Sequence, residues 1–376
     1  MLTQPVDLRL ANARRTLTAA LCEWPCTKPE LGRRTGLSQM TIGKVVRQLL
    51  EKSLLEEVPV QSPPQYGRPP AHLRPSSADR FVGIELGVRE TAIYRIGLTG
   101  ETERSQRRTL ATPADLPALR ALWSAWKAEV GAPSPECVLV AVPGVLDTST
   151  PAIVYSPNLH WTEGRALIDA LAADFDAPVV PVHDTQAQAL GHLAARAGSD
   201  SFLLVDLTDG LGGAVVSEGR LLGGPLPVSG EIGHTAVPGN DRQCGCGARG
   251  CIETLAGRSG LVASFRRSSG HRGAEWADMR EALAGGELPD WLEATLDALA
   301  AVVAGALNLL GFAEVVFVGD LVELHPDVLP RLREGLAQHS LLGRFGRIEA
   351  RAAAERRQLG LLAAAVERVL LTARLT

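Results

Sequence analysis

Residues 230–257 read GEIGHTAVPGNDRQCGCGARGCIETLAG, and this stretch carries the strongest chemical signal in the chain. It contains one histidine and three cysteines, at His234, Cys244, Cys246 and Cys251. One imidazole and three thiolates form a complete tetrahedral set for zinc and leave no position for water, which is typical of a structural metal. Glycines between the cysteines let the backbone fold tightly around an ion. We therefore predict a structural zinc site, with three reduced free thiols as the alternative.

The composition is that of a globular protein with more than one core. The chain has 376 residues, of which 45% are hydrophobic and 21% charged, and this length is enough for two or three cores. The opening residues MLTQPVDLRL lack the apolar stretch of a secretion signal, and no apolar run approaches the ~20 residues that cross a bilayer. We expect a cytoplasmic protein without membrane insertion, in which clustered cysteines indicate metal before disulfide.

Charge is divided unevenly along the chain. Residues 1–80 hold 12 basic and 7 acidic side chains, whereas the remainder holds 26 basic and 35 acidic ones. The first segment therefore carries +5 and the rest −9. This asymmetry favours a module that binds phosphates, attached to a body that need not, although surface charge can also vary between domains without a functional reason.

The N-terminal segment predicts a helix-turn-helix. Residues 8–22 can form a first helix, Thr27 begins a second helix with a capping side chain, and a glycine turn at 36–38 precedes a third. The third helix runs to about Lys52, and its apolar residues make one buried stripe at helical spacing: Ile42, Val45, Val46, Leu49 and Leu50. This geometry places a recognition helix in the major groove of DNA. A helical dimerisation or protein-docking module is the alternative.

The polar face of the third helix supplies the predicted DNA contacts. Residues near its start are candidates for reading base edges: Ser38, Gln39, Thr41 and Lys44. Arg33, Arg34 and Arg47 are candidates for phosphate contacts, which set affinity more than sequence choice.

A wing is predicted after the third helix. Residues 54–58 form a short strand, residues 62–70 form a loop rich in proline and glycine, and residues 71–75 form a second strand. Arg68 at the loop tip is a slim cation suited to a minor groove. The same prolines also fit a stiff linker between domains.

The body of the chain predicts two α/β lobes. Apolar strand signals with turns occur at 81–86 and 202–216, and helical patterns alternate with them at 114–130, 164–175, 185–197, 254–268 and 291–310. We expect a DNA-binding domain at 1–78, a first lobe at 79–197 and a second lobe with the zinc site at 198–376. The C-terminal helix is expected to pack back on the first lobe or the N-terminal domain.

The zinc-site stretch resembles the signature of the ROK family of bacterial sugar kinases and regulators (repressor, open reading frame, kinase). The winged head with its Gly-Arg-Pro tip, the segment Ser156-Pro157-Asn158-Leu159 and the pair His183-Asp184 occur in the order found in that family. The resemblance covers essentially the whole chain. It implies an actin-like ATPase fold with a cleft between two lobes.

The resemblance also implies a sugar site. The positions that match the family's sugar contacts are Asn158, Asp184, Glu231, His234 and Glu253. In the kinases, the position of Asp184 is the general base that takes a proton from the sugar hydroxyl; here we expect it to be vestigial as a base. His183 stands where the enzymes usually have Asn, and this His-Asp pair is similar to repressors of glucose and N-acetylglucosamine uptake.

The phosphate-binding loops of the kinases are altered. The family's first loop resembles Asp-x-Gly-Gly-Thr, where this chain has residues 85–89, ELGVR; its second resembles Gly-Thr-Gly-Ile-Gly, where this chain has residues 208–212, TDGLG. A third loop expected to hold Gly-Gly has Gly319-Asp320. Backbone N–H groups in such loops bind the phosphates, so branched and acidic substitutions predict that kinase activity is lost.

Together these features predict a sugar-responsive transcriptional regulator, and specifically a repressor, of carbohydrate uptake or metabolism genes. Its expected partners are a double-stranded DNA operator, a sugar or sugar phosphate, and further copies of itself in a homodimer or dimer of dimers, with zinc as its structural cofactor. An ATP-dependent sugar kinase with an appended DNA-binding head is the first alternative. The second is a regulator controlled by docking to a sugar-transporter protein.

Overall fold

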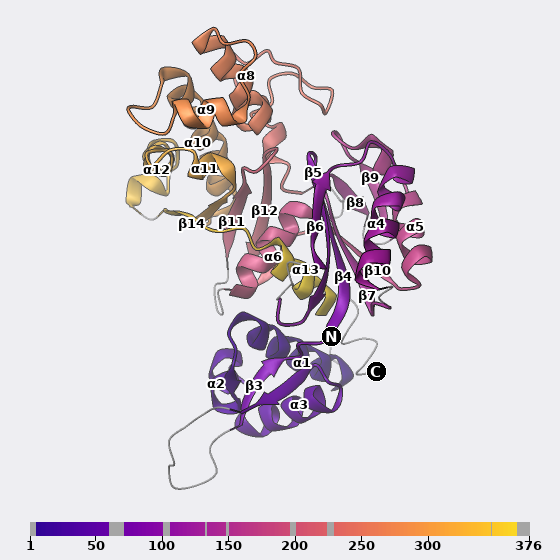
Figure 1. Ribbon diagram of the computed structural model, residues 1–376. Helices are drawn as coiled ribbons and strands as arrows, with labels where there is room; N and C mark the ends of the chain where they lie inside the picture. The colour runs from indigo at the N-terminus through magenta and orange to yellow at the C-terminus, as the bar shows by residue number, and fades with distance from the viewer. Residues whose placement is uncertain are drawn as a thin grey trace. The chain divides into compact units, whose positions relative to one another are not determined.

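The computed structural model describes residues 5–59, 71–100, 106–131, 134–147, 150–195, 201–223, 229–346 and 348–366 (Figure 1). The chain divides into two compact units. Unit 1 comprises Met1–Tyr155, Trp161–Ser199 and Arg356–Thr376, and unit 2 comprises Ser156–His160 and Asp200–Glu355. The C-terminal stretch thus returns to the unit in which the chain begins.

The N-terminal head is a winged helix-turn-helix, as predicted. Its elements are α1 (Pro5–Cys22), β1 (Cys26–Thr27), α2 (Lys28–Thr35), α3 (Gln39–Glu51), β2 (Leu55–Val58) and β3 (His72–Pro75). Strands β2 and β3 pair antiparallel, and β1 adds to the other edge of β3. Arg68, the expected tip of the wing, lies outside the described residues.

Local chemistry fixes both ends of α2. The Thr27 hydroxyl accepts a hydrogen bond from the Glu30 backbone N–H, and the Glu30 carboxylate accepts one from the Thr27 N–H, at 3.4 and 2.6 Å. This reciprocal pair is a capping box. Gly36 ends the helix in the left-handed region, with φ of 67°, where a residue without Cβ is favoured. The predicted start and turn are both confirmed.

The rest of unit 1 is built on a five-stranded sheet of order β10-β7-β4-β5-β6. Its elements are β4 (Asp79–Leu86), β5 (Glu90–Gly97), β6 (Arg108–Ala111), α4 (Leu116–Val130), β7 (Cys137–Val142), β8 (Val145–Asp147), β9 (Ala152–Tyr155), the 3₁₀ turn η2 (His160–Thr162), α5 (Ala166–Phe175), β10 (Val179–His183), α6 (Asp184–Ala195) and α13 (Arg357–Ala365). Strands β4, β7 and β10 run parallel, and β5 and β6 extend the sheet antiparallel.

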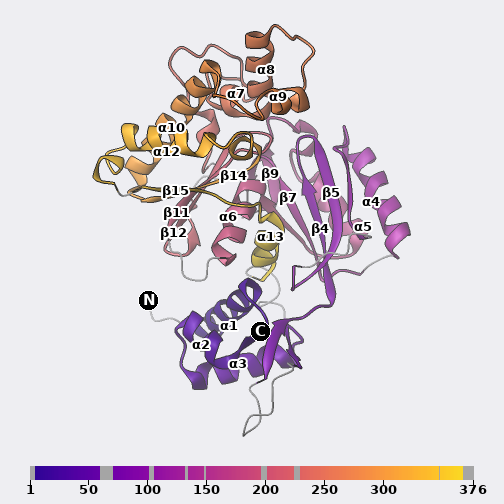
Figure 2. The same ribbon diagram turned by 60° about the vertical axis from the view of Figure 1, so that its left-hand side comes forward.

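Unit 2 repeats this strand order. Its elements are β11 (Phe202–Asp206), β12 (Gly212–Ser217), β13 (Arg220–Leu221), η3 (Ile232–His234), α7 (Glu253–Ala256), α8 (Arg258–Ser269), α9 (Trp276–Ala282), α10 (Asp290–Leu310), β14 (Glu314–Val318), α11 (Asp320–Glu323), α12 (Val328–His339), η4 (Gly343–Phe345) and β15 (Glu349–Ala352). The sheet order is β13-β12-β11-β14-β15, with the parallel strands again at one end (Figure 2). Two sheets of one topology are the repeated architecture expected of an actin-like fold.

Helix α13 packs closely against α6 in unit 1 (Figures 1 and 2). The contact depends on two glycines. A Cβ added at Gly360 would lie 2.6 Å from the Ala187 carbonyl carbon, and one added at Gly191 would lie 2.9 Å from the Arg356 carbonyl carbon. Because these neighbours are backbone atoms, the helices can approach this closely only without side chains at the crossing.

The head is packed on the same helix pair. Helix α1 contacts α6, and buried residues of both belong to one hydrophobic core with residues of α13. At the end of α1, the Cys22 thiol lies against the Ala194 carbonyl near the end of α6. The winged helix-turn-helix therefore rests on a helix that begins at Asp184.

Helix α10 forms much of the core of unit 2. One of its faces is buried with strands β11 and β14 and with α12. By length and apolarity it would suffice to cross a bilayer, which corrects the expectation that no stretch of the chain is apolar and long enough. Less than half of its apolar window is buried, so a second apolar face is exposed.

Candidate functional site

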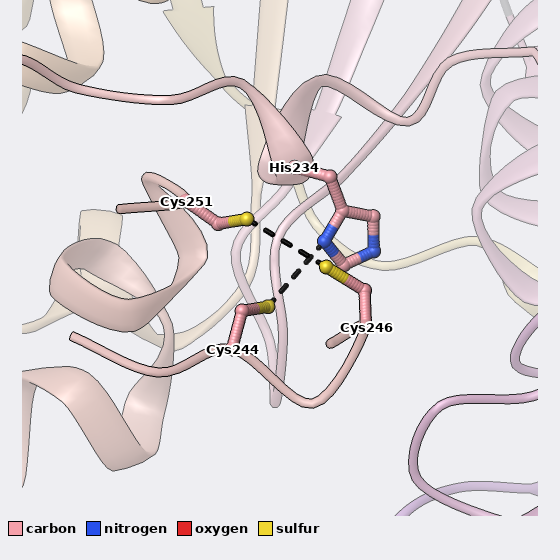
Figure 3. A group of neighbouring side chains, drawn as sticks. All are labelled: His234, Cys244, Cys246 and Cys251. Carbon is pink, nitrogen blue, oxygen red and sulfur yellow. Dashed lines mark hydrogen bonds between the residues drawn. The ribbon is translucent and has the colours of Figure 1, made fainter. Parts of the chain in front are cut away.

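The four predicted metal ligands lie together in unit 2 (Figure 3). Their ligand atoms are all within 4.8 Å of one another. His234 ends the short helix η3, and the cysteines are carried by the loop that follows. Two isolated bridges fold this loop back on itself, Ala236 with Cys251 and Gln243 with Arg249. Segments separated by up to 17 residues thereby converge on one point.

The spacing of the ligand atoms fits a tetrahedral zinc ion. Zinc–sulfur bonds of about 2.3 Å and zinc–nitrogen bonds of about 2.0 Å place two sulfurs about 3.8 Å apart and a sulfur and a nitrogen about 3.5 Å apart. The Cys246 and Cys251 sulfurs are 3.7 Å apart, and the Cys244 sulfur is 3.6 Å from His234 Nδ1. The geometry of these residues therefore suits the metal implied by their chemistry.

The three thiols differ in how readily they lose a proton, as their pKa values indicate. Burial raises the pKa of Cys244 to about 12 and raises that of Cys251. Burial acts in the same direction on Cys246, but hydrogen bonds from the Ala248 backbone N–H and from the two other thiols bring its pKa below the ordinary value. One thiolate is thus favoured among three crowded sulfurs, and a divalent ion would be needed to hold all three as thiolates.

A second layer of side chains fixes the metal loop to α8. The Arg242 guanidinium donates to the carbonyls of Thr254 and Gly260 at 2.7 and 3.1 Å and to the Ser264 hydroxyl at 2.8 Å. The Asn240 amide donates to the Cys251 carbonyl at 3.1 Å. These residues were missed by sequence reasoning, because a polar residue in a glycine-rich loop gives no local sign of the distant groups that it will contact.

Several predicted sugar-binding residues surround the metal loop in unit 2. The Asn158 side-chain oxygen lies 3.6 Å from the position that a Cβ of Gly245 would occupy. A Glu231 carboxylate oxygen is 3.8 Å from His234 Nε2, the ring nitrogen that does not face Cys244. The second nitrogen of the His234 imidazole thus lies beside an acidic side chain, with an exposed amide near the same loop. A metal ion held by the four clustered residues would fix the orientation of this ring.

Two other predicted residues are placed differently. Glu253 begins α7, and its carboxylate accepts a hydrogen bond of 3.1 Å from the Leu211 backbone N–H. Asp184 belongs to unit 1, where it begins α6 and accepts a hydrogen bond of 2.7 Å from the Thr185 backbone N–H. The His183 ring nitrogen Nδ1 lies 3.2 Å from the same carboxylate.

The first altered loop follows β4. Its acidic residue, Glu85, accepts a hydrogen bond of 2.7 Å from the Tyr94 hydroxyl and lies 3.7 Å from the guanidinium groups of both Arg107 and Arg357. Burial, and then the charge of Glu85, raise the pKa of Tyr94 well above its ordinary value, so the hydroxyl remains a donor. This carboxylate is therefore held by protein groups from three other segments.

The second and third altered loops lie in unit 2. A Cβ at Gly210 would lie 2.8 Å from the Glu253 carboxylate, which also accepts the Leu211 N–H. In the third loop, Asp320 forms an ion pair with Arg258, whose guanidinium stacks 4.2 Å from the Trp276 ring centroid. A backbone donor of one loop and the carboxylate of the other are thus already bound within the protein.

The recognition helix presents a mixed surface. Lys44 and Arg47 of α3 and Arg33 of α2 are exposed, as DNA contacts require. Arg34, in contrast, forms an ion pair of 2.7 Å with Glu23 and is only 17% exposed, so its charge is already balanced. Of the three predicted phosphate contacts, the fold leaves Arg33 and Arg47 the more accessible.

Two predicted base-reading residues lie close to other groups of the head, although Gln39 remains exposed. The Gln39 amide nitrogen lies 2.8 Å from the position of a Cβ on Gly32. The Thr41 hydroxyl lies 2.9 Å from that of Ser38, whose oxygen caps the helix. Met40, which was not among the predicted contacts, is 74% exposed. Its signal was an apolar residue on an otherwise polar helix face.

Comparison with known sequences gives one consistent family. The sequence model of the ROK family matches residues 81–366. An N-acetylmannosamine kinase from Escherichia coli (strain SE11) is 29% identical over 269 residues, which make up 66% of this chain and 91% of the kinase. The corresponding kinase from Shigella flexneri is 28% identical over 270 residues, with coverage of 66% and 92%.

Comparison with solved structures identifies the same fold. A ROK family transcriptional regulator, a homologue of the E. coli MLC protein, matches with a TM-score of 0.75 and 21% identity, over 98% of each chain. A ROK family glucokinase from Streptomyces griseus, in complex with glucose and AMPPNP, matches with a TM-score of 0.63 and 24% identity, over 76% of this chain and 97% of the kinase. The match to the regulator covers nearly the whole chain, including the N-terminal head. The match to the glucokinase covers about three quarters of this chain.

Proposed function

The chain belongs to the ROK family, and from this premise we propose that it is a sugar-responsive, DNA-binding transcriptional repressor without kinase activity. The observation that carries the proposal is the architecture. A winged helix-turn-helix precedes a ROK domain that begins near residue 81, and a regulator of this family has the same fold over 98% of the chain. A kinase has no need of a head with an exposed, basic recognition helix.

The proposed ligand is a hexose or an N-acetylhexosamine, free or phosphorylated. The related kinases act on N-acetylmannosamine, and the S. griseus glucokinase holds glucose. Asn158, Glu231 and His234 offer an amide, a carboxylate and an imidazole, which suit a row of hydroxyl groups. Zinc bound to His234 and the three cysteines would fix the loop that carries these groups, and with four protein ligands it would play a structural role.

Loss of phosphoryl transfer is supported by what the altered loops already bind. The Glu253 carboxylate accepts a hydrogen bond from the Leu211 backbone N–H of the second loop. That donor is therefore not available to a phosphate. Like charges about 4 Å apart repel by ~1 to 4 kcal/mol in surface-like surroundings, and each 1.4 kcal/mol is about tenfold in binding. Arg107 and Arg357 beside Glu85 would have to leave that carboxylate before it could serve a bound metal–nucleotide.

The proposed signal passes along α6. Asp184, a predicted sugar contact, begins this helix, and Ala194, about 15 Å further along, meets the end of α1 at Cys22. A ligand that prefers one arrangement of α6 would shift the equilibrium between two positions of the head. The size of the shift is set by the difference in ligand affinity between the two arrangements. This helix therefore joins a ligand residue to the DNA-binding module within one core.

We propose a dimer formed through the exposed face of α10. This face borders a pocket of about 470 Å³ whose lining carries no charged side chain. Leu309, at the rim of the pocket, is 88% exposed. In a dimer with two-fold symmetry, the same surface of both subunits meets. An uncharged face that has both an exposed leucine and a pocket therefore suits contact with a second copy of this chain.

Solution mass tests the dimer without DNA or sugar. Sedimentation is expected to give twice the chain mass, and Leu309→Glu is expected to give monomers because it would bury two carboxylates in an apolar contact. Leu110→Glu, at an exposed leucine of unit 1, is the matched control. A monomeric unaltered protein, or a Leu309→Glu variant that remains dimeric, would contradict this interface.

Fluorescence anisotropy tests the regulator proposal. A duplex selected from a randomised pool is titrated with the protein in the presence of glucose, mannose, N-acetylglucosamine, N-acetylmannosamine and their 6-phosphates. At least one is expected to change DNA affinity by roughly five- to 150-fold, the usual range of coupling between sites, and Asp184→Asn is expected to abolish the change. If no member of the panel alters binding, the sensor proposal fails.

A kinase remains the second candidate because the N-acetylmannosamine kinases are 29% identical over most of their length. A coupled ATP assay with the same sugars distinguishes the two functions. Sugar-dependent turnover that disappears in Asp184→Asn would establish the kinase. Docking to a sugar transporter stays a prediction, which co-purification with a transporter domain would support if the sugar panel has no effect.

A further inference from the structure

Met40 is an exposed apolar residue in the first turn of α3. Its neighbours on both sides lie close to other groups of the head, Gln39 beside Gly32 and Thr41 beside Ser38. Met40 itself is 74% exposed. Most of this long apolar side chain is therefore available to contact a partner of the head.

Gly43 lies one turn further along the same face, and the fold gives no reason for a glycine there. It has no positive φ, in contrast to Gly36 at the end of α2. A Cβ added at Gly43 would meet no atom within 4 Å. Glycine inside a helix nevertheless costs about 1 kcal/mol relative to alanine. The helix therefore accepts a loss of stability that no packing or backbone requirement explains.

Met40 and Gly43 form one stripe with two cations. Lys44 and Arg47 follow at the fourth and seventh positions after Met40, and both are exposed, so the four residues share a helix face. The buried residues Ile42, Val46 and Leu49 define the opposite side. The outer face of α3 thus consists of an apolar side chain, a position without a side chain, and two positive charges.

We propose that this stripe reads a thymine methyl group in the major groove, through Met40, with Gly43 providing the space for the base edge to approach. The proposal rests on the proposed DNA-binding function and names the base that it recognises. The thymine C5-methyl is the apolar group that base pairs present in the major groove. Lys44 would donate hydrogen bonds to guanine acceptors or to a phosphate, and Arg47 would contact the DNA phosphate backbone.

Replacement of thymine by deoxyuridine in the selected duplex tests the methyl contact. Deoxyuridine keeps every hydrogen-bonding group and removes the methyl. For the unaltered protein, at least one replacement is expected to weaken binding about fourfold, the value of one buried methyl group. Met40→Ala should bind the thymine and deoxyuridine duplexes equally, whereas Leu8→Ala, at an exposed leucine of α1, should retain the difference.

Gly43→Ala gives an independent test with two readouts of opposite sign. The variant should unfold at a higher temperature because alanine favours the helix, yet it should bind the selected duplex at least about tenfold more weakly because the methyl occupies the approach to the base. Gly273→Ala, in an exposed turn of unit 2, also adds a Cβ with no neighbour within 4 Å. It should leave both the affinity and the preferred sequence unchanged.

The outcomes separate this inference from the function beneath it. If no duplex is enriched from the pool, the DNA-binding function and this inference both fail. If duplexes are bound but deoxyuridine has no effect, or has the same effect on Met40→Ala, the methyl contact is refuted and the regulator proposal stands. Unchanged affinity in Gly43→Ala would refute the role of the open position.

Discussion

Gly360→Ala tests the packing that joins the head to the ROK domain. The added Cβ would lie 2.6 Å from the Ala187 carbonyl carbon and 2.9 Å from the Gly191 backbone nitrogen. Unstrained contacts between carbon atoms are about 3.5 to 4.0 Å, so α13 must move about 1 Å away from α6. Neither neighbouring atom can rotate aside, because both belong to the backbone of a helix.

The expected cost follows from two opposing contributions. Overpacking of a tight contact costs about 1 to 3 kcal/mol, and occasionally more, whereas alanine in place of glycine contributes about 1 kcal/mol of helix propensity. Because the clash is with backbone atoms of α6 that cannot rotate aside, we take the upper end and predict a net loss of about 2 kcal/mol. Gly191→Ala, on the other helix, should have a loss of the same order.

Urea unfolding followed by circular dichroism measures this loss. Gly273→Ala is the control, since its Cβ meets nothing within 4 Å, and it should be as stable as the unaltered protein. Sugar should also have a smaller effect on DNA binding in Gly360→Ala, because α1 is packed on α6. A Gly360→Ala variant as stable as the control would refute the account of this helix crossing.

Three further predictions concern the metal, acid stability and catalysis. Elemental analysis should find one zinc per chain. Cys246→Ser should lose the zinc, and the free energy of unfolding of unit 2 should fall by several kcal/mol. A metal-free protein of unchanged stability would contradict a structural zinc. Hydrogen bonds from Arg120, and to a lesser extent from Trp123, hold the pKa of Asp174 below its ordinary value of 3.8. The ionised carboxylate therefore stabilises the fold above pH 3.8. Its contribution to the free energy of unfolding is lost as the pH falls through the pKa of the folded state. The loss of unfolding free energy in Asp174→Asn should therefore be present at pH 7 and shrink below pH 3.8; a pH-independent difference would count against the ion pair. Finally, calorimetric titration with Mg·ATP should give no binding heat, and binding at micromolar concentration would overturn the loop argument.

The metal cluster could be predicted because its chemistry is local in sequence. All four ligands fall within 18 consecutive residues, and the glycines among them indicate a tight turn on their own. The support from Arg242 could not be predicted in this way. Its acceptors are carbonyls of Thr254 and Gly260, and only the folded chain brings those groups to the loop.

The helix-turn-helix was predictable for a related reason. Caps, turns and the apolar stripe of α3 are encoded within a few residues of each element, so Thr27 and Gly36 indicated the ends of α2 correctly. Exposure of single side chains was not predictable, because it depends on neighbours from elsewhere. Arg34, for example, is balanced by Glu23, which the spacing of residues could not reveal.

The shared topology of the two sheets could not be predicted from sequence patterns. Period and turn signals predicted strands, but strand order depends on pairings between distant segments, and it was the family resemblance that implied an actin-like fold. Pattern reading also could not predict the crossing of α6 and α13. Gly191 and Gly360 are 169 residues apart, and in the sequence each is merely an isolated glycine in a helix.

The most direct test of the central claim is the affinity of the active sugar for the protein, measured by calorimetry with and without saturating operator duplex. Because coupling between two sites is reciprocal, the sugar affinity should change on DNA binding by the same factor by which the sugar changes DNA affinity. Equal sugar affinities for the free and the DNA-bound protein would contradict a sugar-controlled regulator.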